Sequence, residues 1–152
     1  DNTLTDENWL RAKPEPGPYD NHTVRVVNAL SKRYAIVYLT ARPRPLHQRT
    51  QNWLHKHGFP AGPVLLWYPE KFSWLRPVRY KRDILLEMQR AGLNLAVGVG
   101  NTTGDIKAYR RAGLVPIILG KKLWYADSVD NWAQIETILM TKTPASPPAG
   151  TP

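Results

Sequence analysis

Short apolar runs alternate with longer amphipathic segments along the whole chain, and this alternation constrains the fold more than any other feature of the sequence. Apolar, β-branched runs predict strands at residues 34–39, 64–67, 95–99 and 115–119. Apolar residues at helical spacing predict helices at 20–32, 46–57, 78–90, 105–112 and 129–140. Strands and helices in this order indicate a parallel sheet, and right-handed crossovers place helices on both of its faces. We therefore expect an α/β fold, a three-layer Rossmann-like domain.

Length and composition fit a single globular domain. The chain has 152 residues, of which 42% are hydrophobic, and we assign one core domain to residues 1–140. Residues 141–152 (TKTPASPPAGTP) are rich in proline and have no apolar period, so we expect a disordered tail. No apolar run approaches the roughly 20 residues that a membrane helix needs. The absence of cysteine excludes disulfides and thiolate metal sites.

The formal net charge of +9 has two readings. It fits an anionic partner such as nucleic acid, anionic lipid or a phosphorylated substrate. It equally fits solvated lysines and arginines, since these are spread along the chain without a dense block. The sequence does not fix the compartment, although a cytoplasmic location is favoured, and it leaves the oligomeric state open.

Polar residues follow two of the predicted strands. In a parallel α/β sheet, ligands bind beyond the carboxyl ends of the strands. Thr40, Ala41 and Arg42 come after the first predicted strand, and residues 100–105 (GNTTGD) come after the run LAVGV. Residues 1–5 (DNTLT) have the character of a loop that follows a strand, but that strand is absent from the sequence. Each of these residues alone is typical of a cap, a turn or a solvated surface; their joint placement indicates a site.

These segments, together with Lys81 in residues 80–83 (YKRD), resemble in order and spacing the four motifs of haloacid-dehalogenase (HAD) phosphohydrolases. The resemblance covers the chain to about Leu119. Residues 39–42 (LTAR), 53–54 (WL) and 62–66 (GPVLL) are most similar to the lipin-type phosphatidate phosphatase branch.

The resemblance implies a Mg²⁺-dependent phosphatase that hydrolyses a phosphomonoester through an aspartyl-phosphate intermediate. It implies catalytic roles for Asp1 as general acid and base, Thr40 as a ligand of phosphoryl oxygens, and Lys81 as a neutralising charge. Asp1 and Asp105 would hold the metal. The substrate-binding residues implied are Thr3, Ala41, Arg42 and Asn101. The partner would be a phosphorylated substrate, possibly a lipid, and nucleic acid is not favoured.

The position of the nucleophile distinguishes two functions. The family motif places it two residues before Asp1, so that nucleophile and its strand are missing from this chain; a second possibility is that Asp1 itself is the nucleophile. Without the central strand, the strand ending at Thr40 and the strand after Gly92 would share no neighbour. The alternative function is a catalytically inactive HAD-like module that binds phospholipid or phosphate.

Two further alternatives concern the ligand. The glycines in residues 98–104 could form a dinucleotide-binding turn, but the next strand ends at residues 119–122 (LGKK) without the acidic residue that such a site needs. The segments 5–40 and 40–81 leave no room for a cap domain, so we expect an open site suited to a bulky substrate. Trp67, Phe72 and Trp74 would either form an aromatic rim beside it or cover the core.

Overall fold

The computed structural model describes residues 3–5, 16–67 and 77–141. Our predictions for Asp1, for Phe72 and Trp74 in the rim, and for the tail beyond Thr141 lie outside the described residues. Thr141, which we assigned to the tail, is instead the last residue of helix α5 (Trp132–Thr141). The helices are α1 (Thr23–Ser31), α2 (His47–Lys56), α3 (Pro77–Arg90), α4 (Thr103–Arg111) and α5 (Trp132–Thr141), with a 3₁₀ turn η1 (Arg44–Leu46) before α2. The strands are β1 (Tyr38–Pro43), β2 (Val64–Trp67), β3 (Val97–Gly100), β4 (Val115–Leu119) and β5 (Asp127–Val129).

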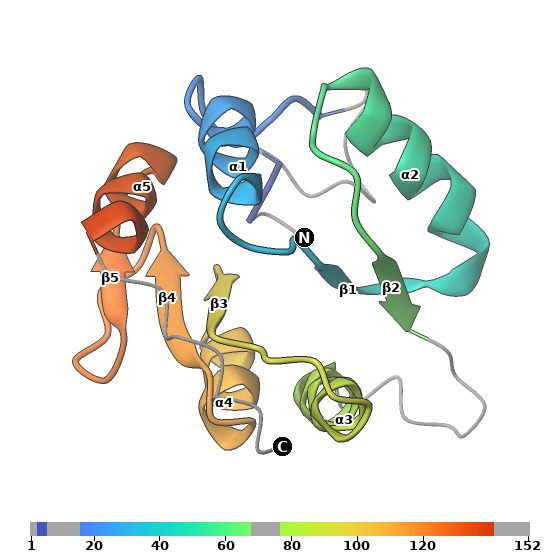
Figure 1. The fold of residues 1–152 in the computed structure, drawn as a ribbon, viewed down its shortest axis with the longest axis vertical. Helices are drawn as coiled ribbons and strands as arrows, with labels where there is room; N and C mark the ends of the chain where they lie inside the picture. Colours follow the sequence, from blue (N-terminus) through green and yellow to red (C-terminus); the bar gives the residue numbers. More distant parts are fainter. Residues whose placement is uncertain (1–2, 6–15, 68–76, 142–152) are drawn as a thin grey trace, which may run out of the picture.

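The elements form the layered α/β arrangement that the alternation predicts (Figure 1). All three strand pairs of the described residues are parallel: β1 with β2, β3 with β4, and β4 with β5. Figure 1 shows α1, α2 and α5 on one side of the strands and α3 and α4 on the other. The fold class predicted from sequence is confirmed. None of the helices in the described part of the chain is long and apolar enough to cross a membrane.

The strands form two separate sheets in the described residues, with orders β1-β2 and β3-β4-β5. The inner edges of β1 and β3 face the same cavity of about 400 Å³, which both strands line. Its apolar walls include Leu39 from β1, Val97 from β3, Leu30 from α1 and Leu85 from α3. In the described residues β1 and β3 therefore belong to different sheets and share no strand neighbour.

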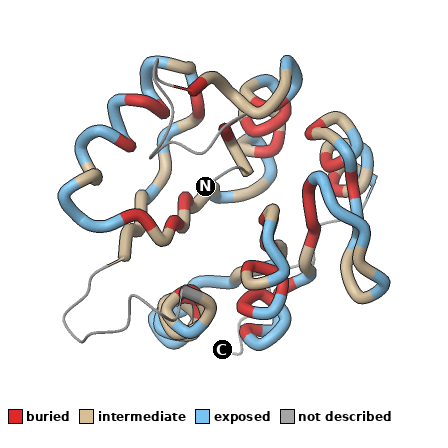
Figure 2. The backbone as a smooth tube through the Cα atoms, turned by 180° about the vertical axis from the view of Figure 1, so that it is seen from behind, coloured by how far each residue is buried: buried red, intermediate tan, exposed pale blue. Residues whose placement is uncertain are grey.

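Two apolar clusters hold the layers together, and buried segments run along the inner side of each helix (Figure 2). The larger cluster lies among α1, α2 and α5 and contains Val26, Trp53 and Ile135. The smaller lies among α3, α4 and β4 and contains Leu85 and Ile106. These two clusters fix the positions of the helices around the ends of the strands.

The first strand differs from its prediction in register. Residues 34–37 are apolar but lie before the ladder, because pairing with β2 begins only at Tyr38, opposite Val64. Between Leu39 and Pro43 the chain advances four residues while β2 advances two, from Leu65 to Trp67, so β1 carries a bulge. Thr40, Ala41 and Arg42 therefore lie in the bulge of β1, and the expectation that they follow the strand was wrong. Bulges of this kind redirect side chains and are common beside functional sites.

The sequence analysis also missed β5. Its three residues, Asp127 to Val129, include one buried apolar side chain, which is too little for a periodic pattern. β5 forms because the segment after β4 returns and pairs with it, Ile117 opposite Asp127 and Leu119 opposite Val129. The strand extends the second sheet on the side away from β3.

Candidate functional site

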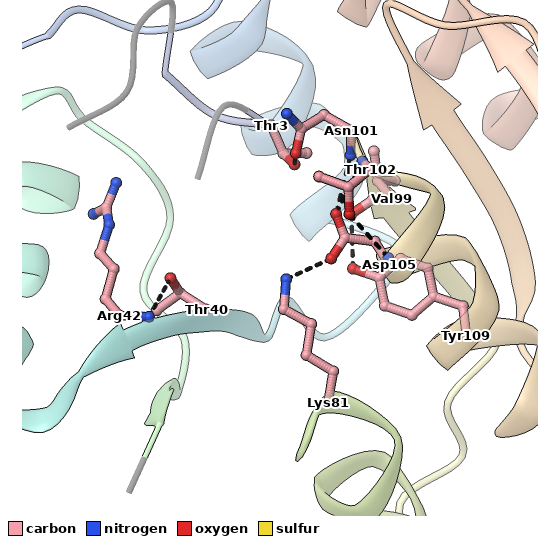
Figure 3. A network of polar contacts seen from close by, with 9 residues as sticks. All are labelled: Thr3, Thr40, Arg42, Lys81, Val99, Asn101, Thr102, Asp105 and Tyr109. Carbon is pink, nitrogen blue, oxygen red and sulfur yellow. Dashed lines mark hydrogen bonds and ion pairs between the residues drawn. The ribbon is translucent and has the colours of Figure 1, made fainter. Parts of the chain in front are cut away.

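The carboxylate of Asp105 is the centre of a polar network at the carboxyl end of β3 (Figure 3). Thr102 caps α4: its hydroxyl accepts a hydrogen bond from the Asp105 backbone N–H at 3.1 Å, and Asp105 Oδ2 accepts from the Thr102 N–H at 3.1 Å. This is a capping box. Asp105 Oδ2 also accepts from the backbone N–H of Asn101 at 3.3 Å. The helix thus begins two residues before the predicted start, and Asp105 lies in its first turn rather than at its cap.

Lys81 supplies the positive charge of the network. It comes from α3, and its Nζ lies 2.5 Å from Asp105 Oδ1. Both residues are buried, with 7% of Lys81 and 5% of Asp105 exposed. Burial acts to raise the pKa of Asp105, but the charge of Lys81 and the hydrogen bonds from Lys81 and Thr102 outweigh it, and the net pKa is lowered. The carboxylate is therefore ionised at neutral pH and is held in one orientation by three donors.

Gly100 allows this close approach. A Cβ atom at Gly100 would lie 2.5 Å from Cβ of Asp105 and 3.0 Å from its Oδ2. Any side chain at this position would displace the carboxylate, because contacts this short do not occur between real Cβ atoms. Gly100, which follows the LAVGV run, is therefore required for steric reasons beside the Asp105 carboxylate.

Thr3 and Asn101 meet at the same end of β3, as the motifs imply. The Thr3 hydroxyl donates to Oδ1 of Asn101 at 3.2 Å, although the two residues are 98 positions apart. The carbonyl of Thr3 accepts a hydrogen bond from Trp132 Nε1 at 3.0 Å, which ties the start of the chain to α5. Two of the predicted substrate-binding residues thus lie beside the Asp105 network.

Thr40, Ala41 and Arg42 come from the other sheet. The Thr40 hydroxyl accepts a hydrogen bond from the Arg42 backbone N–H at 3.2 Å within the bulge of β1. In Figure 3, Lys81 extends from α3 between this bulge and Asp105, while the Arg42 guanidinium points away from both. Burial, and then the charge of Arg49, lower the pKa of Arg42 to about 10. Thr40, Arg42 and Lys81 line the same cavity; roles for them in binding a phosphate stay predictions.

Tyr109 is part of the same network, and the sequence analysis did not select it. Its hydroxyl donates to the carbonyl of Val99 at 3.0 Å, one residue before Gly100. Burial, with the charge of Asp105, raises the pKa of this phenol, so it remains a neutral donor. Residues 105–109 (DIKAY) fit the lipin-type resemblance, but the resemblance gave Tyr109 no role. Thr102 had a signal of its own, because the T-x-x-D spacing of residues 102–105 is that of a capping box.

The oxygen donors present suit Mg²⁺ in type. Mg²⁺ prefers carboxylate and carbonyl oxygens, keeps several waters, and needs only one or two protein carboxylates when a phosphate is bound. Asp105 and the amide oxygen of Asn101 are such donors. Within residues 3–5, 16–67 and 77–141, no group of three or more His, Asp or Glu side chains could hold a metal ion. A metal here would therefore bind through Asp105, Asn101, water and the substrate, with any contribution of Asp1 lying outside the described residues.

Comparison with known proteins decides the family. Residues 1–118 match the LNS2 domain of PITM 1-3. The chain belongs to this family. LNS2 is a lipin-like domain of the HAD type, so the resemblance found in the motifs is confirmed at that level.

The curated relatives are much longer proteins. This LNS2 domain is 34% identical over 84 residues to membrane-associated phosphatidylinositol transfer protein 1 of rat and human, and 30% identical over 82 residues to protein retinal degeneration B of Drosophila melanogaster. The matched segment covers 53–55% of this chain but 6% of each relative.

A solved structure shares the fold. A D,D-heptose 1.7-bisphosphate phosphatase from B. bronchiseptica, crystallised with magnesium and phosphate, aligns over 92% of this chain and 94% of its own, with a TM-score of 0.66 and 14% identity. At this identity the likeness shows that the LNS2 domain has the fold of a HAD phosphatase.

Proposed function

We propose that this LNS2 domain binds a phosphomonoester beside Lys81 and Asp105 and hydrolyses it in a Mg²⁺-dependent reaction. The observation that carries the proposal is the buried Lys81–Asp105 pair at the carboxyl end of β3, across from the β1 bulge that holds Thr40. Phosphoryl transfer depends mainly on positioning and on stabilisation of charge, and a fixed buried ion pair provides both.

Each residue has a distinct part in this proposal. Lys81 neutralises charge between the phosphate and the carboxylates, and its low exposure makes that charge effective. Thr40 donates a hydrogen bond from its hydroxyl to a phosphoryl oxygen. Asp105 and Asn101 would hold Mg²⁺, and the bound ion would supply positive charge to the phosphate. The chain's contribution is therefore to orient the phosphate and to keep its charge compensated.

We further propose that a strand between β1 and β3 carries the nucleophile, two residues before Asp1. Two observations support this. The cavity between the sheets is lined by both strand edges and by apolar side chains of α1 and α3. Thr3, four residues after the proposed nucleophile, is hydrogen-bonded to Asn101 at the carboxyl end of β3. A strand leading to Thr3 and parallel to β3 would therefore pass through this cavity. On this proposal the reaction proceeds by attack of the strand-end carboxylate on phosphorus, with Asp1 as general acid to the leaving group.

Binding without hydrolysis is the second candidate. The network of Figure 3 contains one carboxylate, Asp105, whose two oxygens are already engaged by Lys81 and by the N–H groups of Asn101 and Thr102. An arrangement with one satisfied carboxylate suits recognition of an anion as well as catalysis. The relatives named as phosphatidylinositol transfer proteins favour a lipid ligand in either case.

We also propose that the site lacks a cap and accepts a bulky or lipid substrate. Between β1 and α3 the described residues form η1, α2 and β2, which are elements of the core fold. Trp67 ends β2 and packs on Tyr80 with ring centroids 6.4 Å apart, and the Tyr80 hydroxyl donates to the Leu66 carbonyl. Trp67 is thus held against Tyr80, which precedes Lys81 in α3. On this proposal the chain of a bulky substrate passes over Trp67.

The experiment compares two substrates, phosphatidate in mixed micelles and a small aryl phosphate, each with Mg²⁺ and with EDTA. We expect Mg²⁺-dependent phosphate release that is lost in Asp105→Asn. Trp67→Ala should lower the rate on phosphatidate and leave the aryl phosphate unaffected. If no phosphate is released but phosphatidate still binds in a way that depends on Lys81, the domain binds its ligand without hydrolysing it. Binding and release both unaffected by Asp105→Asn would show that the site lies elsewhere.

A further inference from the structure

The loop between β4 and β5 presents a tryptophan to solvent. We call residues 120–126 (GKKLWYA) the docking loop. Trp124 is 93% exposed, which stands out for so large an apolar side chain. Gly120, with φ of 72°, turns the chain at the end of β4, and its N–H donates to the carbonyl of Val129 at 2.8 Å. The loop therefore starts from a fixed point on the sheet.

Both neighbours of Trp124 are anchored. Leu123 and Tyr125 pack against the smaller apolar cluster, beside residues such as Leu114 and Ile118. The Leu123 N–H donates to the Ser128 hydroxyl at 2.9 Å, and that hydroxyl lies 3.2 Å from the Leu123 carbonyl. Because the residues on each side of it face the core, the indole between them is held outward. The exposure of Trp124 follows from the way the loop is built.

Exposed basic side chains lie in the docking loop and on α4. Lys121 and Lys122 are exposed in the docking loop itself. The guanidinium of Arg110 lies over the ring of Tyr125, 5.2 Å from its centroid. The exposed residues of α4 continue the basic surface at helical spacing, namely Lys107, Arg110 and Arg111. Asp127, at the start of β5, is the acidic residue at the end of the loop, and it already has an interaction partner.

The composition of this surface matches the interface of an anionic bilayer. Tryptophan favours the headgroup region, where its ring is apolar and its N–H remains hydrated. Lysine and arginine near a negatively charged leaflet add to the binding. The loop carries one exposed indole, whereas a nucleic acid is held in a groove or on a platform of several aromatic rings. We propose that the docking loop and the outer face of α4 attach this domain to membranes that contain anionic lipids.

Tyr125 and its neighbour Trp124 lie toward the end of α4 that is away from Asp105. Asp105 is in the first turn of α4, whereas Arg110, which contacts the loop through Tyr125, is in the last. At 1.5 Å per residue the two are about 7.5 Å apart along the helix axis. Lys121 and Lys122 instead follow the carboxyl end of β4, which pairs with β3 up to Gly100 opposite Ile118. Vesicles without a phosphomonoester and the Asp105→Asn variant therefore keep the two proposals distinguishable.

The test measures cosedimentation of the protein with vesicles of phosphatidylcholine, with and without phosphatidylserine. Phosphatidylserine carries no phosphomonoester, so binding to it does not report on the phosphate site. We expect binding only to the phosphatidylserine vesicles. Replacing Lys121→Gln and Lys122→Gln together should weaken it by about 25-fold, since each lysine contributes about five-fold. Trp124→Ala should weaken it by about ten-fold.

Matched variants separate the docking surface from general charge. Lys32→Gln with Lys56→Gln makes the same change of net charge on α1 and α2, and should leave binding within about two-fold of the original protein, because a remote charge acts only through screened long-range attraction. Asp105→Asn should bind phosphatidylserine vesicles as the original protein does, whatever becomes of hydrolysis. Equal binding to both vesicle types, or an equal loss in the two lysine pairs, would overturn the proposal.

Discussion

Lys81 on α3 and Asp105 on α4 form an ion pair at 2.5 Å with both side chains almost fully buried, although 24 residues separate them in sequence. The pair joins the two helices on one side of the sheets and fixes the polar network at the end of β3. A buried pair of this kind costs desolvation energy, which the hydrogen bonds from Asn101 and Thr102 to Asp105 help to offset. Its members are therefore coupled in stability as well as in function.

Removing one partner should destabilise the domain. Lys81→Ala leaves a buried, uncompensated carboxylate, and we expect a loss of about 3–5 kcal/mol in the free energy of unfolding. Asp105→Asn combined with Lys81→Ala should recover part of that loss, because no charge then remains buried. Chemical denaturation of the single and double variants measures this coupling. Additive effects of the two changes would contradict a direct pair.

Thr40→Ala should act on the reaction rather than on stability. The Thr40 hydroxyl accepts a hydrogen bond from the Arg42 N–H, and this bond lies within the β1 bulge. Loss of one preorganised donor to the phosphate should raise the barrier by about 3–4 kcal/mol. We expect turnover to fall by two to three orders of magnitude, as about 1.4 kcal/mol corresponds to ten-fold, with an unfolding midpoint close to that of the original protein. Unchanged turnover would remove Thr40 from the site.

Gly100→Ala should disrupt the site through a steric contact. The added Cβ would meet the Asp105 side chain at 2.5 Å and force it to move. Gly98→Ala is the matched control, because its Cβ would meet the ring of Tyr109 at 2.4 Å instead. We expect both variants to lose stability, and Gly100→Ala to lose more phosphate affinity, measured by calorimetry with inorganic phosphate and Mg²⁺. Equal affinities in the two variants would mean that Asp105 does not hold the ligand.

The carboxylate of Asp20 should make the free energy of unfolding depend on pH in the acid range. It accepts hydrogen bonds from the backbone N–H of His22 and Trp132 and from the Thr23 hydroxyl, at 2.8–3.0 Å. Burial acts to raise its pKa, but these hydrogen bonds lower it below the ordinary value of 3.8. The stabilisation is therefore complete above that value and is lost as the pH falls through the lower folded-state pKa.

Asp20→Asn tests this dependence. The variant should be less stable than the original protein at neutral pH and should match it at the acid end of the range, where Asp20 is protonated in both states. Asp130→Asn, at an exposed carboxyl beside α5, is the control and should not change the pH profile. If the difference in unfolding free energy between Asp20→Asn and the original protein stays constant with pH, the stabilisation by these hydrogen bonds does not depend on the charge of Asp20.

Periodicity predicted the helices and the order of the strands because each buries a regular apolar face. The helix 78–90 and the strands 64–67 and 115–119 lie where the pattern places them. β1 was misplaced because its start depends on a partner: pairing begins where β2 passes, opposite Tyr38, and not where the apolar run begins. β5 has one buried residue, so it exists only through its pairing with β4.

The site was partly predictable for a similar reason. Thr3, Lys81, Asn101 and Asp105 follow strand or helix boundaries that the sequence marks, and the structure places them in contact. Tyr109 and the β1 bulge could not be predicted, because they depend on side-chain packing between elements and on the spacing between two strands. The orientation of the Arg42 guanidinium could not be predicted for the same reason. The sequence analysis made no prediction for Trp124, whose exposure depends on the anchoring of its neighbours to the core.

The most direct test of the central claim is release of inorganic phosphate from phosphatidate in mixed micelles, measured for the original protein and for Asp105→Asn, with Mg²⁺ and with EDTA. The account predicts phosphate release only by the original protein with Mg²⁺, with the Asp105→Asn protein folded but inactive. Release that continues in EDTA, or that is equal in the two proteins, would contradict a Mg²⁺-dependent site built on Asp105.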